Sequence, residues 1–183
     1  MPRLHTAAVS RVCVLLPRAV LNVMLKQRVA RLPKETGGFL LGRRRGSHIE
    51  IVEATLQAKM DRASETSFER IDLHHRHRAE AVWQSSEGRI GLVGDWHTHP
   101  CGPPVPSAAD RSAWRQLVSS IQGDAVGIIL AEGGPGVFVA PRRWSVLGAR
   151  QCSLVEECEE DLVFGGGGCN PRRAGKREAA FFA

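Results

Sequence analysis

The sequence predicts a mixed α/β fold, with a curved, mixed β-sheet flanked by helices. Signals for strands and for helices are interleaved along the chain. The 183 residues suit one compact domain, since single domains usually contain about 100 to 200 residues. With 43% hydrophobic and 24% charged residues, the composition is close to that of an average soluble globular protein. These observations exclude two large domains, a collagen-like chain and a disordered chain.

The first predicted elements are a strand and a helix that follows it directly. Residues 9–16 are apolar and rich in valine and leucine, which favours a short buried strand. Pro17 then occupies the position of a first helical residue, where a missing N–H is tolerated. Residues 18–31 consist of good helix formers, and Pro33 ends this predicted helix.

A β-hairpin with a basic tip is predicted next. Residues 39–42 and 49–53 have the composition of strands, and residues 43–47, which include three consecutive arginines, join them. Two interpretations of the tip remain open. The arginines either meet an acidic partner or belong to a solvated turn without a specific role.

The middle of the chain predicts a polar loop at residues 59–66 and a helix at residues 72–84. Four residues of this helix are available to the core: Leu73, Ala79, Val82 and Trp83. The same segment contains His74, His75 and His77, which suggest a metal site. Residues two apart on a helix point in different directions, so His75 and His77 cannot share a ligand geometry there. A structural role is therefore favoured for these histidines.

Ile90, Leu92 and Val93 predict a strand that runs into the segment Asp-Trp-His-Thr-His-Pro at residues 95–100. After a proline-rich loop, Ser107 opens a predicted helix that extends through residue 122.

Two further strands are predicted at residues 125–131 and 137–139, across a glycine-rich turn. From residue 165 onward the chain has four glycines and then a basic segment without periodicity, which predicts a flexible tail. We therefore expect one domain over residues 1–164 and a tail over residues 165–183.

Charge and cysteine usage narrow the function classes. Lysine and arginine number 25 against 19 acidic residues, but 21 of the 25 are arginine, a bias typical of GC-rich genomes. Nucleic-acid binding is therefore disfavoured. Five cysteines, an odd number without a CxxC pair, predict reduced thiols. Because neither a signal peptide nor an apolar run of about 18 residues is found, we expect a cytoplasmic protein without a membrane partner.

Two histidines at the end of a strand predict a metal site. His97 and His99 are two apart, so both side chains project from the same face of the strand while Thr98 projects from the other. A catalytic zinc needs three protein ligands and an open fourth position, and Asp110 is the nearest downstream carboxylate that completes the set. The intervening loop is stiffened by four prolines, at positions 100, 103, 104 and 106.

Ser107 and Asp110 also form a potential capping box, with Ser107 as the N-cap and an acidic residue three positions later. The two interpretations are compatible, since a first-turn side chain stays close to the helix start. A hydrolytic zinc site further needs a proton acceptor, and Glu35, just before the Gly37-Gly38 pair, is the natural candidate. The alternative for a single loop glutamate is a solvated surface charge, and it stays open at this point.

These residues together resemble the JAMM (MPN) family of zinc metalloproteases. The family pattern is a glutamate, then His-x-His, seven residues, a serine, two residues and an aspartate, and this sequence matches it without a gap. The resemblance covers about residues 9–150 and implies a JAMM-like fold. It also implies that His97, His99 and Asp110 bind one zinc ion with water in the fourth position. Glu35 would then act as general base and acid, and Ser107 would stabilise the oxyanion of the tetrahedral intermediate.

The resemblance implies cleavage of peptide or isopeptide bonds after the C-terminal glycine of ubiquitin or a ubiquitin-like protein. The segments at residues 64–70 and 94–100 are more similar to prokaryotic members, in particular to the deconjugating proteases of bacterial CBASS antiphage operons. The implied partner is a protein with a C-terminal modifier tail, either a ubiquitin-like protein or a CBASS nucleotide cyclase. Two alternatives remain open: C-terminal trimming of a ubiquitin-like or sulfur-carrier protein, and a non-catalytic scaffold of the same fold.

Cys101 departs from the pattern, two residues after His99. It is either a competing soft metal ligand or an ordinary loop cysteine, and the second interpretation is favoured.

Overall fold

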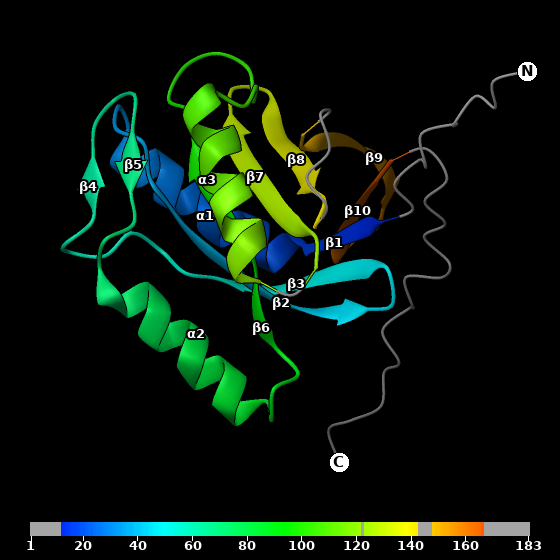
Figure 1. Cartoon of the computed structure of the whole chain (residues 1–183). Coiled ribbons are helices and arrows are strands. Elements are labelled where there is room, and N and C mark those ends of the chain that lie inside the picture. Colours follow the sequence, from blue (N-terminus) through cyan, green and yellow to red (C-terminus); the bar gives the residue numbers. More distant parts are fainter. Residues whose placement is uncertain (1–11, 122, 143–147, 167–183) are drawn as a thin grey trace, which may run out of the picture.

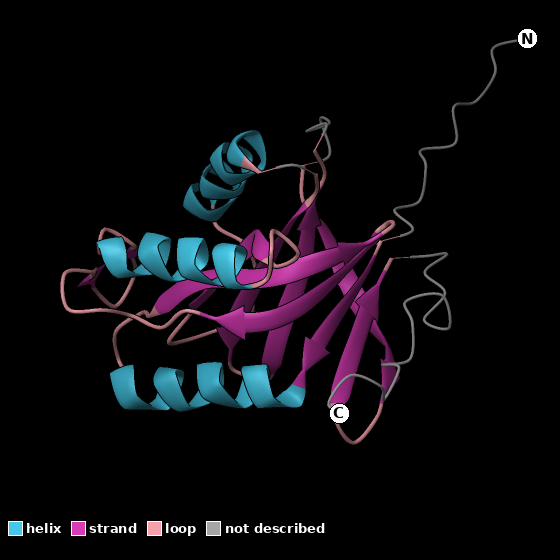
Figure 2. Cartoon of the chain, turned by 90° about the horizontal axis from the view of Figure 1, so that it is seen from below, coloured by secondary structure: helices cyan, strands magenta, loops and turns pink. Residues whose placement is uncertain are grey.

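The computed structural model describes residues 12–121, 123–142 and 148–166 (Figure 1). Within these ranges, eight strands form one mixed sheet that closes into a barrel, in the order β1-β10-β9-β8-β7-β6-β2-β3. Figure 2 shows helices on opposite sides of the strands. The predicted mixed α/β class is confirmed. The sheet is not the open curved sheet we expected, because β1 pairs with both β10 and β3 and so joins the two edges.

The barrel strands are β1 (Cys13–Pro17), β2 (Gly37–Arg45), β3 (His48–Ala54), β6 (Gly91–Thr98), β7 (Ala125–Ala131), β8 (Gly134–Ala140), β9 (Arg150–Glu157) and β10 (Asp161–Gly165). A separate two-stranded hairpin consists of β4 (Arg62–Ala63) and β5 (Phe68–Glu69), within the predicted loop and just beyond it. The helices are α1 (Arg18–Arg31), α2 (Leu73–Ser85) and α3 (Ala108–Ser120). The pairs β1–β3 and β6–β7 are parallel and the other barrel pairs are antiparallel.

Strands β9 and β10 are absent from the prediction. Most side chains of β9 are exposed. Its sequence therefore does not need the alternation of hydrophobic and polar residues that marks a half-buried strand, and this signal is missing. Strand β10 closes the barrel and extends to Gly165, the first residue of the predicted tail. Residues 167–183 lie outside the described residues, so the division at residue 164 remains a prediction.

The main core fills the barrel, and every barrel strand contributes to it. On β7, Val126, Ile128 and Leu130 point into this core, while Ile129 points outward toward α3. A second cluster, built around Trp114 of α3, lies on the outer faces of β7 and β8. Helix α3 is thereby packed against the outside of the barrel, next to the strand that carries the predicted histidines.

The bounds of α1 agree with the prediction, but Pro17 is not its first helical residue. Pro17 has extended backbone angles and is the last residue of β1 as well as the N-cap of α1. Helix α2 begins one residue later than predicted because Asp72 caps it, accepting a hydrogen bond from the His74 N–H. Val82 is buried as expected, whereas the predictions that Leu73 and Trp83 enter the core are wrong: 56% and 54% of these residues are exposed.

The three arginines of the predicted basic tip belong to β2, which extends to Arg45 before the turn at Gly46. Arg43 and Arg45 form ion pairs with Glu50 on the adjacent strand. Arg44 donates a hydrogen bond to the backbone carbonyl of Asp124. The interpretation as a solvated turn without a specific role is wrong for these side chains, because they bind within the chain, and contact with an acidic partner stays a prediction.

Among the described cysteines, Cys101, Cys152 and Cys158 are free thiols. Cys13 is disulfide-bonded, so the prediction of reduced thiols is wrong at that position. None of the helices in the described ranges is both long enough and apolar enough to cross a membrane.

Candidate metal centre

Three predicted ligands converge at the end of β6. His97 lies in β6, His99 follows that strand directly, and Asp110 lies in the first turn of α3. The Nε2 atoms of the two histidines are 3.2 Å apart, and Asp110 Oδ1 lies 3.1 Å from His97 Nε2. Asp110 Oδ2 lies 3.6 Å from His99 Nε2. In the described part of the chain, these three residues are the one group of His, Cys, Asp or Glu side chains that meets the geometry of a metal site.

Local sequence explains this convergence. Trp96 points into the barrel core, so its neighbours Asp95 and His97 point outward. The predicted capping box is present: the Ser107 N–H donates to Asp110 Oδ2 at 2.6 Å, and the Asp110 N–H donates to Ser107 Oγ at 3.2 Å. The turn that begins α3 therefore also directs the Asp110 carboxylate toward the histidines.

The donor atoms fit a tetrahedral zinc ion. Ligand bonds of about 2.0–2.1 Å place tetrahedral donor atoms about 3.3 Å apart. The two Nε2 atoms are 3.2 Å apart, and each lies within 3.6 Å of one of the two Asp110 carboxylate oxygens. Burial raises the pKa of the Asp110 carboxyl, but hydrogen bonds with His97 and His99 outweigh it and hold this pKa well below its usual range. Asp110 is thus ionised, and two imidazoles and one carboxylate form a donor set that zinc favours.

Glu35 lies between α1 and β2, is buried, and lines the same cavity as the three ligands. Its N–H donates to the Ser64 carbonyl at 2.7 Å. Thr36 and Thr98 are joined by two hydrogen bonds, Thr36 N–H to Thr98 Oγ1 at 2.9 Å and Thr98 N–H to the Thr36 carbonyl at 2.8 Å. These bonds fasten Glu35 beside the His-x-His segment.

Burial raises the pKa of Glu35, and the partial opposition of His97 and His99 leaves it above its ordinary value. A carboxyl group whose pKa is raised by burial holds a proton more readily than an exposed carboxyl, which suits it to accept and return a proton.

The cavity has a volume of about 610 Å³ and opens beside the β4–β5 hairpin, which forms one wall. Phe68 of this hairpin lies close to Gly37, where an added Cβ would come within 2.9 Å of the phenyl ring. Gly37 therefore lets the hairpin approach β2 at the mouth of the site. Ser107 and Cys101 also line the cavity.

Comparison with known proteins identifies the family. Residues 17–146 match the family described as prokaryotic homologues of the JAB domain. The chain belongs to this family. The resemblance found in the sequence is thus confirmed, as a prokaryotic JAB protein.

Relatives of this JAB protein include isopeptidases. A CD-NTase/cGAS isopeptidase of Pseudomonas aeruginosa is 43% identical over 83 residues, which are 45% of this chain and 52% of the relative. Its counterpart in Vibrio cholerae is 31% identical over 107 residues, 58% of this chain and 69% of the relative. A protein of Sinorhizobium fredii named as a probable metalloprotease is 28% identical, over a match that covers 79% of this chain and 90% of the relative. The match thus spans about half the length of the Pseudomonas relative.

A solved structure shares the fold of this JAB protein. The solution structure of a protein from Desulfitobacterium hafniense has a TM-score of 0.53 and 22% identity, and covers 81% of this chain and 95% of that one.

Several residues of the site escaped the sequence analysis. Asp95 lines the cavity, and its spacing of two from His97 on a strand was the available signal. Arg28 of α1 donates to the Pro100 carbonyl at 3.1 Å and so ties the segment after His99 to that helix. The hairpin wall carried no signal, because its two-residue strands are too short for hydrophobic periodicity.

The histidines of α2 do not form a metal site. His75 is buried. Its Nε2 atom lies 2.7 Å from Asp61 Oδ2, and its Nδ1 atom lies 2.7 Å from Thr55 Oγ1. Thr55 Oγ1 accepts from the Phe39 N–H at 2.7 Å, and the Thr55 carbonyl accepts from Trp96 Nε1 at 2.9 Å. A neutral His75 that donates to Asp61 and accepts from Thr55 satisfies every group in this chain of contacts. The favoured structural interpretation is confirmed for His75.

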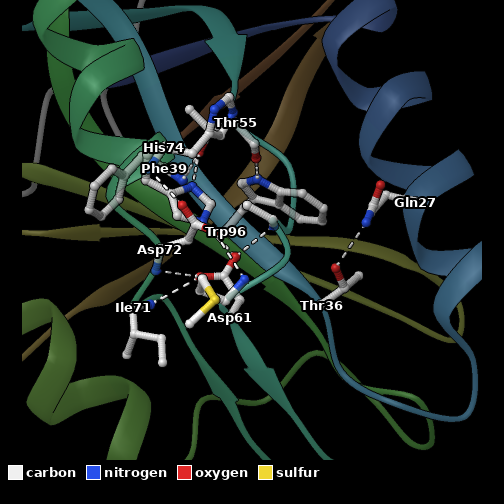
Figure 3. A network of polar contacts seen from close by, with 12 residues as sticks. Gln27, Thr36, Phe39, Thr55, Asp61, Ile71, Asp72, His74 and Trp96 are labelled. Atoms are coloured by element: carbon white, nitrogen blue, oxygen red, sulfur yellow. Dashed lines mark hydrogen bonds and ion pairs between the residues drawn. The ribbon is translucent and has the colours of Figure 1, made fainter.

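Asp61 organises both ends of the segment that carries the hairpin. Its carboxylate accepts hydrogen bonds from the N–H groups of Ala58, Ile71 and Asp72, as well as contacting His75 (Figure 3). The Asp61 side chain is 0% exposed. Asp61→Ala leaves these donors without an acceptor, so we expect the free energy of unfolding to fall by about 3 kcal/mol. Urea unfolding measures this, and the exposed Arg62→Ala on the same hairpin is the control.

The contribution of Asp61 to stability depends on pH. Burial raises the pKa of Asp61, but hydrogen bonds from Ala58, Asp72 and His75 outweigh it and lower this pKa. The stabilisation is therefore present above the unfolded value of about 4 and is lost as pH falls through the lower folded value. The stability difference between wild type and Asp61→Ala should shrink in that acidic range; a constant difference would contradict the assignment.

Cys101 lines the cavity as an exposed free thiol and is not part of the ligand group. We expect Cys101→Ser to retain the zinc content of the wild type, measured by elemental analysis after dialysis. A loss of metal in this variant would show that Cys101 is a ligand.

Proposed function

We propose that this protein is a zinc-dependent isopeptidase that releases a modifier protein from its targets by cutting after the modifier's C-terminal residue. The observation that carries the proposal is the burial of Glu35 in one cavity with His97, His99 and Asp110, whose spacing suits zinc. A proton acceptor beside a metal centre is the arrangement that hydrolysis of an amide needs.

In this proposal His97, His99 and Asp110 hold the ion. Bound zinc supplies a Lewis acid that polarises the scissile carbonyl and acidifies a water molecule. Glu35 accepts a proton from the attacking water and later donates it to the leaving amine, for which its raised pKa suits it. The backbone hydrogen bonds of Glu35 and Thr36 fix the backbone from which the Glu35 carboxylate enters the cavity, which reduces the ordering that the reaction requires.

Ser107 has the hydrogen-bonding capacity for oxyanion stabilisation. Its Oγ accepts a hydrogen bond from the Asp110 N–H, and its hydroxyl also bonds the Asp110 carboxylate, so the hydroxyl hydrogen must turn from that carboxylate to reach an oxyanion. Because Ser107 lines the cavity beside the ligands, this hydrogen can meet negative charge that develops on the carbonyl oxygen.

The substrate we propose is a protein with an extended C-terminal tail. Relatives named CD-NTase/cGAS isopeptidases support a CD-NTase as the modifier, and a ubiquitin-like protein has the same kind of tail. An extended tail fits the cavity between the hairpin wall and the start of α3.

The test is intact-mass analysis of the zinc-loaded protein with two fusions, a CD-NTase and a bacterial ubiquitin-like protein, each extended at its C terminus. Cleavage of the CD-NTase fusion after its native C-terminal residue supports the proposal, and cleavage of the ubiquitin-like fusion instead assigns the other modifier. A preference for short extensions over conjugated proteins would indicate trimming. Absence of cleavage despite bound zinc would contradict the proposal and favour a scaffold.

A further inference from the structure

Asp95 is a buried carboxylate in the cavity that the proposed reaction does not use. It lies on β6 two residues before His97, and its side chain is 3% exposed. Its two oxygens have different partners. Oδ1 accepts a hydrogen bond from Trp114 Nε1 at 2.7 Å, and Oδ2 accepts one from Arg70 Nη2 at 2.5 Å.

The Trp114 contact connects β6 to the helix that supplies the third ligand. Trp114 lies four residues after Asp110 on α3, so both side chains project from the same face of the helix. The indole is fully buried and packs on Gly127 of β7, where an added Cβ would come within 2.2 Å of the ring. Phe138 packs beside it, with ring centroids 5.3 Å apart. The hydrogen bond to Asp95 adds a directional restraint to this packing, because it requires the indole N–H to face the histidine strand.

The Arg70 contact connects the same strand to the wall of the cavity. Arg70 directly follows β5, and its guanidinium lies over the Phe39 ring, 5.5 Å from the ring centroid. Its side chain is 18% exposed. A charge-assisted bond to a buried carboxylate is among the stronger protein hydrogen bonds, so it holds the end of the hairpin against β2 and β6.

We propose that Asp95 is a positioning residue that acts through its two hydrogen bonds, called here the Trp114 arm and the Arg70 arm. The Trp114 arm sets the place of Asp110 relative to His97 and His99, and thus the geometry of the metal site. The Arg70 arm fixes the position of the hairpin wall, against which the substrate tail lies. This inference rests on the proposed function.

Trp114→Phe and Arg70→Met separate the two arms. Trp114→Phe keeps most of the buried ring but removes the N–H donor. We expect the zinc dissociation constant to rise by about tenfold, as it does when outer partners of metal ligands are lost. KM for the extended CD-NTase fusion should stay unchanged. Arg70→Met removes the other arm, so KM should rise by about tenfold while the zinc dissociation constant stays unchanged. Arg70→Lys, which restores a charged donor, should recover part of the loss in KM.

Zinc affinity is measured by competition with a chromophoric chelator, independently of turnover. Trp83→Phe and Arg76→Met on the exposed part of α2 are the matched controls, and thermal unfolding of each protein establishes that it is folded. A wild type that neither binds zinc nor cleaves would refute the proposed function. The role of Asp95 alone would be overturned in two cases, both with an active wild type. In the first, Trp114→Phe and Arg70→Met both keep the wild-type zinc dissociation constant and KM; in the second, both variants change the same one of these two parameters.

Discussion

Glu35→Ala is expected to abolish cleavage while the protein still binds zinc. Glu35 is the buried carboxyl that lines the cavity beside the ligands, and it is not one of the three ligands. General acid–base catalysis contributes about 10²- to 10⁴-fold, so kcat should fall by about three orders of magnitude. The measurement is the rate of product formation by intact mass with the zinc content determined on the same sample.

Glu80→Ala is the control for this result, because Glu80 is an exposed glutamate of α2 that does not line the cavity. It should retain turnover within the same order of magnitude. If Glu35→Ala cleaves at the wild-type rate, Glu35 is not the base, even where the protein is a zinc enzyme.

His97→Ala is expected to remove zinc from the protein and turnover with it. His97 Nε2 lies within 3.2 Å of donor atoms on both His99 and Asp110, so its loss leaves two of the three proposed ligands. Loss of a ligand costs more than loss of an outer partner, for which the range is about 10- to 100-fold in metal affinity. The zinc dissociation constant should therefore rise more than about 100-fold.

His77→Ala provides the comparison, since His77 is an exposed histidine of α2 outside the ligand group. Its zinc content and turnover should equal those of the wild type. Zinc retained by His97→Ala and lost from His77→Ala would move the metal site to α2 and refute the centre at β6.

The elements and residues that could be predicted from the sequence are those with a local physical cause. The bounds of α1 follow from helix formers that end just before a proline, and the start of α3 follows from the capping box of Ser107 and Asp110. Strand alternation is equally local, and it places His97 and His99 on one face. Alternation thus identified the histidine pair and Asp110 was the nearest downstream carboxylate, whereas the role of Glu35 followed from the resemblance to the JAMM family.

The predictions that are wrong concern features that depend on packing between elements. Whether Leu73 or His75 of α2 is buried depends on what packs against each face of the helix, and the exposed Leu73 and buried His75 reverse the hydrophobic expectation. His75 tolerates burial because Asp61 and Thr55, 14 and 20 residues away, satisfy both ring nitrogens.

Short-range rules therefore account for the helices, the cap of α3 and the pairing of the two candidate histidine ligands. Closure of the barrel, the cavity wall and the partners of Asp95 required long-range packing. Strand β10 pairs with β1 across nearly the whole described chain, and Arg70 reaches Asp95 across 25 residues. Such contacts depend on the relative placement of elements that are distant in sequence, and no local pattern of residue types encodes that placement.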